Sequence, residues 1–576
     1  MKTTIKTLII LLIFSQIAIA DYHYASHEGS NEYPYTSWET AADSIQKAIT
    51  ASEPSDTVYV GEGVFYENID LTDTLAIIGM GWENTKVHST DKIIYGGEGA
   101  VFKGFWIEGE DGIHDWGITL GASPGSRYMI VEDCKITNCQ TGIWGWAGGI
   151  YRNNIIMDNE YGINLPGYDP VIENNTIIDN QDEGIYGGFS SPTIKNNFMA
   201  RNGLGAISYS QLYGRAEIYN NIFYDNGLNT RTGAQVGIVY GKSLIYNNYF
   251  GMSEIKETCL GFSEGIGVDS VINNIFSKGR YGLWIGYSFV FVLYNDFYDN
   301  EEDIHLFYGE DSLIGNIYTN PMVTSEDDGF RLQAFSPCID AGHPDLLDVD
   351  SSRSDIGAYG GPYGTSYVYE DYPPEPPDSL QFTFQRPDTI HIGWIQATEA
   401  DFNHYNIYRS TNSGFPSSPE YLIAESDTFF YKDTDWNREH NYYYLITSID
   451  NQGLESQPSD ELAVIFTSVT EGNDDFLPHH VELKQNYPNP FNPETTISYY
   501  IPPIGAQPAE VKIEIYNIRG EIVKTLVDDY QYPGHHRIAW GGTDDNGDKL
   551  SSGIYFYNLK MWNTAFTHAR KMVLVK

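Results

Sequence analysis

The chain is poor in cysteine, in basic residues and in long apolar runs. It has 4 cysteines in 576 residues, which excludes a dense disulfide framework. Only 33 residues are basic against 78 acidic, a formal net charge of -45, and such a surface repels nucleic acid and anionic lipid. Beyond the N-terminal leader, no stretch reaches the roughly eighteen apolar residues of a membrane-spanning helix. We therefore expect no nucleic-acid partner and no membrane-spanning segment in the mature chain.

Residues 1–20 have the pattern of a secretory signal peptide. Lys2 and Lys6 precede the apolar run from Leu8 to Phe14, and Ala18–Ala20 places small residues at the cleavage positions. We predict that the mature chain begins at Asp21. The protein is then expected to be secreted or held at the outer cell surface.

Asparagine pairs recur every twenty-odd residues along the first half of the chain. If the second Asn is the zero of each repeat, apolar residues stand three positions before and two positions after it, and only the loops vary in length. These apolar runs are short and rich in β-branched or aromatic residues, which favours coiled parallel strands over helical repeats. The pairs are Asn153-Asn154, Asn174-Asn175, Asn196-Asn197, Asn220-Asn221, Asn247-Asn248 and Asn273-Asn274, and the series extends to Cys134, Asn295 and Asn316.

We interpret these asparagines as architecture. Asn tolerates positive φ at a tight corner, and its amide can bond to the Asn of the coils on either side. Cys134 and Cys139 stand where two rows begin, and we favour small buried side chains there over a disulfide. The second row, five residues after the first, contains Asn159, Asn180, Asn202, Asn226 and Asn300.

An amphipathic helix is predicted from about Trp38 to Ala51, capped by Thr36 or Ser37. Such a helix would cover the open end of the first coil, which otherwise exposes apolar core and a free strand edge.

Three stretches resemble the secreted right-handed parallel β-helix proteins of the pectate-lyase-like superfamily. They are the helix followed by residues 56–60 and 63–68, the Asn repeats, and the run 336–342 with 355–359. The resemblance covers residues 21–366. With the two regions that follow, it implies an all-β chain: a right-handed parallel β-helix solenoid with an N-terminal capping helix, then two β-sandwich (Ig-like) domains.

Residues 367–379 are rich in proline and read as a stiff linker. Residues 380–469 resemble a fibronectin type III domain, on the strength of Trp394, the run from Tyr405 to Arg409, and Tyr442 at the position of a tyrosine corner.

After a second linker, 470–482, residues 483–576 resemble the C-terminal sorting domain of proteins exported by the type IX secretion system. The opening motif runs from Leu483 to Pro493, and the closing motif from Lys571 to Lys576. The resemblance implies the type IX machinery as a partner, followed by removal of this domain and release or surface attachment.

Outward columns of aromatic residues mark the candidate carbohydrate-binding surface. A Gly-Ile step recurs in the coils, and because the Ile points inward, the next residue points outward. Flat rings repeated at the coil spacing of about 4.8 Å suit a glycan chain, although the same rings can instead stack on one another. One column contains Trp144, Asn164, Tyr186, Val239, Trp284 and His305, and the second contains Trp146, Phe189, Tyr213, Tyr240 and Tyr287.

A polar column six residues before the zeros is the catalytic candidate, with Asp169, Ser191, Arg215 and Lys242. Elimination from a uronic-acid polymer needs a cation beside the sugar carboxylate and a base for the C5 proton. A solvated polar column is the alternative. Asp182 and Glu183 with Asp169 would in principle supply the two carboxylates of a glycosidase.

The acidic loop of Asp345, Asp348, Asp350 and Asp355 is a candidate structural Ca²⁺ site, since closely spaced oxygen ligands around a turn suit this ion. A polar surface loop is the alternative.

We conclude from the sequence that the β-helix recognises extracellular polysaccharide. A polysaccharide lyase, less readily a glycosidase, and a non-catalytic adhesin or surface structural protein are the alternatives.

Overall fold

The computed structural model describes residues 21–465 and 482–575, apart from the short segments 72–73, 90–91, 97–98, 111–114, 121–128, 146–147, 211–214, 228–232, 240–241, 256, 308–311, 386–388, 438, 487–488, 490, 492–494, 502–508, 520–521, 532–533, 546–547 and 562–565. The predicted signal peptide and most of the second linker lie outside these residues. Two compact units are formed: Met1–Glu375 with Ala397–His404 and Ser448–Ser456, and Pro376–Gln396 with Tyr405–Thr447 and Gln457–Lys576.

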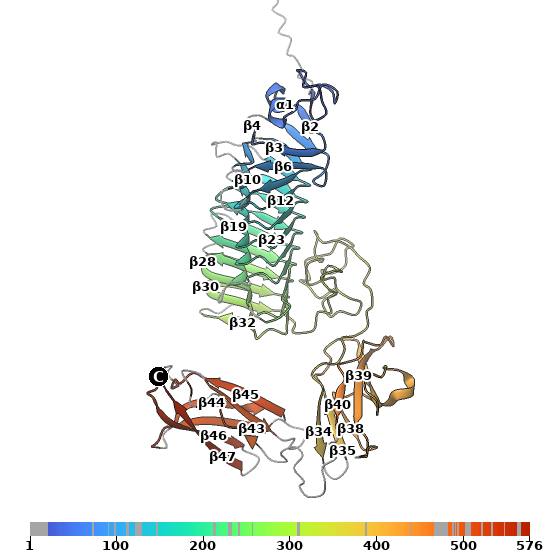
Figure 1. Cartoon of the computed structure of the whole chain (residues 1–576), viewed down its shortest axis with the longest axis vertical. Helices are drawn as coiled ribbons and strands as arrows, with labels where there is room; N and C mark the ends of the chain where they lie inside the picture. Colours follow the sequence, from blue (N-terminus) through green and yellow to red (C-terminus); the bar gives the residue numbers. More distant parts are fainter. Residues whose placement is uncertain are drawn as a thin grey trace, which may run out of the picture. The chain divides into compact units, whose positions relative to one another are not determined.

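The first unit is a parallel β-helix whose coils stack from the helix α1 to the strand β32 (Figure 1). One wall is an 11-stranded parallel sheet with a single short strand per coil. Its strands are β3 (Gly63–Tyr66), β6 (Thr85–Ser89), β9 (Trp106–Gly109), β12 (Lys135–Thr137), β15 (Ile155–Met157), β18 (Thr176–Ile178), β21 (Phe198–Ala200), β24 (Ile222–Tyr224), β27 (Tyr249–Gly251), β29 (Ile275–Ser277) and β31 (Asp296–Tyr298).

Two further walls complete each coil, and the long strands β28 (Thr258–Ile272) and β30 (Tyr281–Leu293) take part in both. One wall contains β10 (Trp116–Leu120), β13 (Thr141–Gly145), β16 (Tyr161–Leu165), β19 (Glu183–Gly188), β22 (Gly205–Ser210), β25 (Ala234–Val239) and β32 (Glu302–Leu306). The other contains β11 (Met129–Glu132), β14 (Gly149–Arg152), β17 (Val171–Glu173), β20 (Thr193–Lys195), β23 (Ala216–Tyr219), β26 (Ser243–Tyr246) and β33 (Ser312–Ile314). The first coils use β1 (Tyr22–Ala25), β2 (Thr57–Val60), β4 (Ile69–Leu71), β5 (Ala76–Gly79), β7 (Ile94–Gly96) and β8 (Val101–Lys103).

The two properties that we assigned to one Asn are divided between the two members of each pair. The first Asn takes the left-handed conformation, as at Asn174 with φ 57° and Asn196 with φ 54°. The second Asn forms the ladder: the Asn197 carboxamide oxygen accepts from the Asn175 main-chain NH at 2.9 Å and from its side-chain NH₂ at 3.0 Å. The ladder runs from Asn154 to Asn316.

The second row also forms a ladder, but a different residue type continues it at one coil. Asn226 donates its main-chain NH to the Gln235 side-chain oxygen at 3.3 Å, where the next coil has no Asn in register. Cys139 donates its main-chain NH to Asn159 at 2.9 Å, and Cys134 does the same to Asn154. All four cysteines are buried and free, which confirms the small-side-chain interpretation.

The capping helix α1 is shorter than predicted and runs from Ile45 to Ala51, with Ser44 as its N-cap. The residues before α1 are not helical, because Ala42 pairs with the segment of β1: its main-chain NH donates to the Tyr24 oxygen, and its oxygen accepts from the Ser26 NH. Glu67 reinforces the start of α1 by accepting from the main-chain NH groups of Ile45 and Gln46. A carboxylate at this position satisfies NH groups that lack partners within the helix.

The run 336–361 packs on the outside of the coils through the first Asn of three pairs. Asn220 donates to the main-chain oxygens of Ala358 and Gly360, and Asn247 donates to that of Asp355. Asn273 accepts from the main-chain NH of His343 at 2.7 Å. The left-handed Asn therefore turns the chain and also binds the closing segment.

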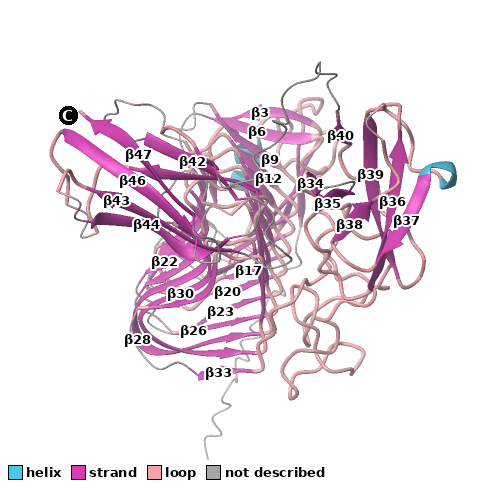
Figure 2. Ribbon diagram, turned by 90° about the horizontal axis from the view of Figure 1, so that it is seen from below, coloured by secondary structure: helices cyan, strands magenta, loops and turns pink. Residues whose placement is uncertain are grey.

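Two sandwiches follow the solenoid along the chain, each with a three-stranded and a four-stranded antiparallel sheet. Most of their residues belong to the second unit, whereas the start of β36 and the end of β39 belong to the first. In Figure 2 the described molecule is drawn almost entirely as strands and loops, with little helix. The first sandwich has β34 (Gln381–Gln385), β35 (Thr389–Gly393) and β38 (Phe430–Asp433) against β37 (Leu422–Ser426), β36 (Phe402–Ser410), β39 (Tyr442–Asp450) and β40 (Leu462–Val464), with the 3₁₀ turn Pro419–Tyr421. The second has β41 (Glu482–Leu483), β42 (Thr495–Ile501) and β45 (Gly534–Trp540) against β44 (Ile522–Gln531), β43 (Ala509–Tyr516), β46 (Gly553–Met561) and β47 (Phe566–Leu574).

Local contacts explain the motifs of both sandwiches. The Tyr442 hydroxyl accepts from the main-chain NH of Asn437 at 3.2 Å, the bond expected of a tyrosine corner. In the second sandwich, Phe491 exchanges main-chain hydrogen bonds with Val573 and Val575, so the opening and closing motifs lie side by side. The all-β architecture with a capping helix and two sandwiches is confirmed. No helix among the described residues has the length and apolarity to cross a membrane.

Candidate functional site

We call the outward side of β10, β13, β16, β19, β22, β25, β28, β30 and β32 the aromatic face. Strand register defines one row on it: Trp144 opposes Asn164, Asn164 opposes Tyr186, and Trp284 opposes His305. One position differs from the sequence expectation. Val236, rather than Ile238, opposes Ile207, so Gly237 stands in the row where we had placed Val239. The row is therefore Trp144, Asn164, Tyr186, Ser208, Gly237, Gly261, Trp284 and His305.

A second row of rings lies three residues before the first row, at Trp116, Tyr161 and Tyr281. Its rings pack against those of the first row, with centroids 4.4 Å apart for Trp116 and Trp144 and 6.1 Å apart for Tyr161 and Tyr186. Sequence reasoning missed this row, although a signal was present: each of the three residues directly precedes the Gly of a Gly-Ile or Gly-Leu step. Trp144 and Trp284 are half-buried, and Tyr186 is 42% exposed.

Between Tyr186 and Trp284 the row carries three small residues, Ser208, Gly237 and Gly261. A Cβ placed on Gly237 would meet no atom within 4 Å, so the surface is open there. Four coil steps separate the two rings, a distance of about 19 Å at the usual strand spacing. The aromatic face thus presents a flat strip of small residues bounded at each end by a ring.

The second predicted aromatic column is described only in part. Trp146, Tyr213 and Tyr240 lie outside the described residues. Phe189 is 47% exposed just after β19, with φ 59°, and Tyr287 is 59% exposed on β30.

The candidate catalytic residues lie at the corner just beyond the aromatic face. Arg215 directly precedes β23 and Lys242 directly precedes β26, and the two occupy adjacent coils because the Ala216 main-chain NH donates to the Lys242 main-chain oxygen at 3.1 Å. Both are exposed, and neither forms an ion pair within the part of the chain that the structure describes. Asp169, two coils from Arg215, instead accepts from the main-chain NH of Ser191 at 2.7 Å.

Glu183 is one of the carboxylates on the aromatic face, where it stands at the start of β19. Burial, together with the nearby Asp182, raises its pKa above the ordinary value. Tyr161, in the same row, has its pKa raised to about 12 by burial and by Asp182. Asp169 lies beyond the opposite end of these strands, roughly 17 Å away for a six-residue strand, whereas glycosidase carboxylates face each other at about 5–10 Å. Glu183 and Asp169 therefore do not flank one bond.

The predicted Ca²⁺ loop is held by its own hydrogen bonds. The Asp348 carboxylate accepts from the main-chain NH groups of Asp355 and Gly361, and the Asp350 carboxylate accepts from Ser352. The Asp355 carboxylate accepts from the main-chain NH of Asp340 and from the Tyr369 hydroxyl. Asp345 is exposed. Within the described residues, these four side chains do not form a group of three that could share one ion.

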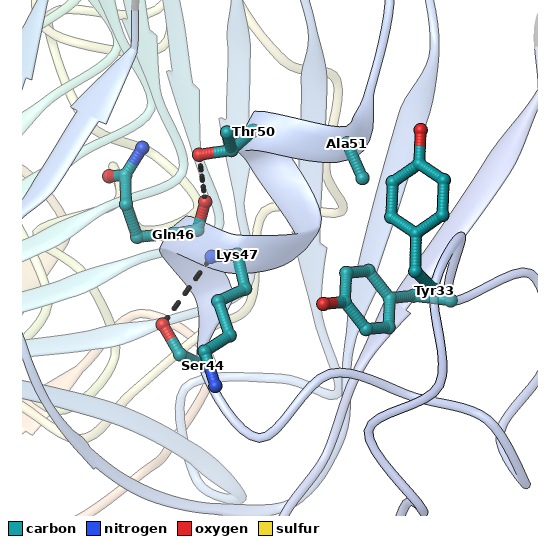
Figure 3. A pocket seen from close by; sticks show the side chains of 7 residues that line it. Tyr33, Ser44, Gln46, Lys47, Thr50 and Ala51 are labelled. Carbon is teal, nitrogen blue, oxygen red and sulfur yellow. Dashed lines mark hydrogen bonds between the residues drawn. The ribbon is translucent and has the colours of Figure 1, made fainter.

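A shallow pocket beside α1 is lined by Tyr33, Tyr35, Ser44, Gln46, Lys47, Thr50 and Ala51 (Figure 3). Its polar groups already have partners: the Thr50 hydroxyl donates to the Gln46 main-chain oxygen at 2.7 Å, and the Lys47 ammonium contacts Asp43 at 2.6 Å. It contains none of the residues predicted to bind or to act on a substrate.

Family models match two parts of the chain. One described as a right handed beta helix region matches residues 110–250, and one described as the FlgD Ig-like domain matches residues 502–565. The solenoid is thus a right-handed β-helix, as predicted, and the second sandwich is Ig-like. No curated protein matches the chain.

Solved structures similar to parts of the chain include pectate lyase Pel9A, with 15% identity, a TM-score of 0.39, and coverage of 60% of this chain and 97% of that one. An alginate lyase from Paenibacillus sp. str. FPU-7 shares 14% identity with a TM-score of 0.29, covering 48% of this chain and 96% of that one. An Fn3-like protein from Clostridium thermocellum shares 27% identity with a TM-score of 0.15, covering 17% of this chain and 100% of that one.

Proposed function

We propose that the β-helix recognises an extracellular polysaccharide along its aromatic face. The observation that carries this proposal is the open strip of Ser208, Gly237 and Gly261 between the rings of Tyr186 and Trp284. Aromatic rings bind sugar through their flat apolar faces, and the small residues between them let an extended chain approach the sheet. The exposed rings of Phe189 and Tyr287 extend the apolar surface beside this strip.

Arg215 and Lys242 give the proposed ligand a chemical preference. They follow β22 and β25, the strands that contribute Ser208 and Gly237 to the strip, so the two cations lie on the same coils. In a chain of net charge -45, two adjacent cations with no ion pair among the described residues favour an anionic group as partner. A polysaccharide that contains uronic acid provides such carboxylates.

A polysaccharide lyase is the second candidate function, and the same two cations favour it. In β-elimination a base removes the proton at C5 of a uronate, the electrons form the C4–C5 double bond, and the glycosidic oxygen at C4 leaves with a proton. Lys242 or Arg215 would neutralise the sugar carboxylate and so acidify the C5 proton. Asp169, whose carboxylate accepts from Ser191, is the base that we predicted from the sequence.

We further infer export to the cell surface or the medium by the type IX secretion machinery. The leader 1–20 and the motifs of the second sandwich support this, together with the pairing of Phe491 with Val573 and Val575, which explains why both ends of that domain carry the motif. The domain boundaries stay predictions. Mass spectrometry of the protein recovered from culture medium and from cell surfaces would show whether chains begin at Asp21 and whether residues 483–576 are removed.

The experiment that tests the proposed function is a binding screen of the full chain against uronate-containing and neutral polysaccharides, with and without Ca²⁺. Far-ultraviolet absorbance of an unsaturated product is recorded in parallel. Binding without product supports recognition, and product supports the lyase. The proposal fails if neither binding nor product is seen with any polysaccharide, which would favour an adhesin or a structural protein.

Lys242→Ala separates the two candidate functions. The side chain is exposed and makes no ion pair among the described residues, so the fold is expected to persist. A lyase would lose product formation while retaining most of its binding. A recognition module would lose a few-fold in affinity for uronate-containing glycan and none for a neutral one.

A further inference from the structure

Three aspartates form a cluster that none of the functions above uses. Asp371 lies in the proline-rich linker, Asp401 directly precedes β36, and Asp450 ends β39; all three belong to the first compact unit. One carboxylate oxygen from each lies within 4.8 Å of the other two. Two oxygens bound to one Ca²⁺ at about 2.4 Å can be at most about 4.8 Å apart, so the three fit around a single ion.

The second observation is that one oxygen of each of these carboxylates is buried and has no hydrogen-bond partner. Asp401 is 5% exposed and Asp450 is 2% exposed, and Oδ2 of each has no hydrogen bond. Oδ1 of Asp371 is likewise buried and unpartnered. No Lys, Arg or His of the described chain forms an ion pair with any of the three. Buried carboxylates without a donor or a counter-charge are strongly disfavoured unless a cation is present.

The surrounding backbone holds the cluster in place. The other Asp450 oxygen, Oδ1, accepts from the main-chain NH groups of Gln452 at 2.9 Å and Leu454 at 2.8 Å, whereas Oδ2 has no hydrogen bond. The Asp401 main-chain oxygen accepts from the Asn451 NH at 2.8 Å, so the two loops are tied together. The Glu375 NH donates to the Glu399 carboxylate at 2.9 Å and brings the proline-rich segment alongside.

We propose that Asp371, Asp401 and Asp450 bind one Ca²⁺ ion, which fastens the start of the proline-rich segment to the loops before β36 and after β39. Three carboxylates offer hard oxygen ligands, which Ca²⁺ accepts in flexible geometry, with water completing the shell. Mg²⁺ demands a stricter octahedron and gives up its water reluctantly, so it binds more weakly here.

Electrostatics agrees with this assignment. Burial and the neighbouring Asp450 raise the pKa of Asp371, and burial with Asp450, Asp371 and Glu399 raises that of Asp401. Without a cation these carboxylates repel one another, and Ca²⁺ reverses the sign of that interaction. The proposal is independent of polysaccharide recognition.

The test is a Ca²⁺ titration of the chelator-treated full chain, followed by calorimetry and by the melting temperature, with Mg²⁺ in parallel. Asp401→Asn and Asp450→Asn keep the shape of the side chain and remove one charge. Each should weaken Ca²⁺ binding at least tenfold. The exposed Asp427→Asn, on the same sandwich, is the matched control and should bind like the parent.

The effect of Asp450→Asn on the melting temperature should change sign when Ca²⁺ is added, and this change distinguishes a metal site from a merely structural cluster. Without Ca²⁺, Asp450→Asn should melt at or above the parent temperature because it relieves repulsion. With Ca²⁺ it should melt below the parent. A protease of broad specificity should also cut the chain near residues 371–379 more slowly when Ca²⁺ is present.

Two outcomes would overturn the proposal. One is a parent chain whose melting temperature and protease resistance do not respond to Ca²⁺. The other is Ca²⁺ binding that survives both Asn substitutions but is lost in Asp345→Asn, which would place the ion in the acidic loop of residues 345–355.

Discussion

The interior and the exterior of the β-helix follow opposite rules. Inside, successive coils repeat the same residue at the same position of the coil, as in the Asn ladder from Asn154 to Asn316. On the aromatic face, the row from Trp144 to His305 changes residue type at almost every coil. Repetition is needed where buried amides must bond to one another, whereas a binding surface needs variety. The contrast separates residues that build the coil from residues free to act on a ligand.

The largest expected effect comes from breaking the ladder with Asn197→Ala. Asn197 is buried, its Oδ1 accepts two bonds from Asn175, and its side-chain NH₂ donates to the Ile172 main-chain oxygen at 2.9 Å. Each buried group left without a partner costs about 1–3 kcal/mol, so we expect a loss of about 2–5 kcal/mol. Chemical denaturation followed by circular dichroism measures it.

Asn164→Ala is the matched control, because Asn164 is the same residue type on the aromatic face and its side chain makes no hydrogen bond within the described chain. Its stability should change by less than about 0.5 kcal/mol. Equal losses in the two variants would remove the distinction between interior and exterior.

A second test uses a buried charge on the outer side of the coil, at Asp296, where the run 336–361 covers β31. Asp296 is buried, accepts from the Thr319 main-chain NH at 3.0 Å and from the Cys338 thiol at 3.4 Å, and burial raises its pKa to about 7. The folded pKa exceeds the unfolded value of about 3.9, so the stabilisation is complete below about pH 4 and is lost as pH rises to about 7. The change is at most about 4 kcal/mol.

Asp296→Asn should raise the melting temperature at pH 7.5 and reduce its pH dependence between pH 7 and pH 5. Burial also raises the pKa of Asp269 and of Asp355, each to about 6, so part of the dependence should persist in this variant. An unchanged pH profile would show that Asp296 titrates normally.

Glycine substitutions test the same contrast between the interior and the aromatic face, with smaller expected changes in stability. A Cβ on Gly162 would lie 2.4 Å from the Gly184 main-chain oxygen, whereas a Cβ on Gly237 would meet nothing within 4 Å. Gly162→Ala should therefore destabilise the solenoid by about 1–3 kcal/mol. Gly237→Ala should be neutral or mildly stabilising. Thermal melting of the two variants side by side checks this, and a tolerated Gly162→Ala would count against the packing described here.

The fold could be predicted because the coil interior repeats. The Asn pairs and their apolar neighbours specify parallel coils without knowledge of the loops, and the tyrosine corner at Tyr442 was recognisable from its position. The capping helix was predicted too long, since hydrophobic periodicity cannot show that Ala42 bonds to β1. The ladder through Gln235 was also hidden, because that amide reaches the row from a different place in the sequence.

The candidate site could be predicted only partly, because the outward residues do not repeat from one coil to the next. The Gly237-Ile238 step placed Val239 in the row that Gly237 occupies, because in this coil Val236 stands where the other coils have the Ile of the Gly-Ile step. The carboxylates of Asp371, Asp401 and Asp450 are up to 79 residues apart in sequence, and only the folding of the loops brings them together. The candidate Ca²⁺ loop at 345–355 was chosen for local acidity, and its carboxylates accept hydrogen bonds from their own backbone.

The most direct test of the central claim is the affinity of the full chain for the polysaccharide that it binds in the screen, compared with a Trp144→Ala, Trp284→Ala double variant. Tyr66→Ala is the control, because Tyr66 is 77% exposed on β3, a strand of the 11-stranded sheet. Each ring contributes about 0.5–1.5 kcal/mol, so the double variant should bind about tenfold more weakly while the control matches the parent. A double variant that binds as tightly as the parent would contradict recognition along the aromatic face.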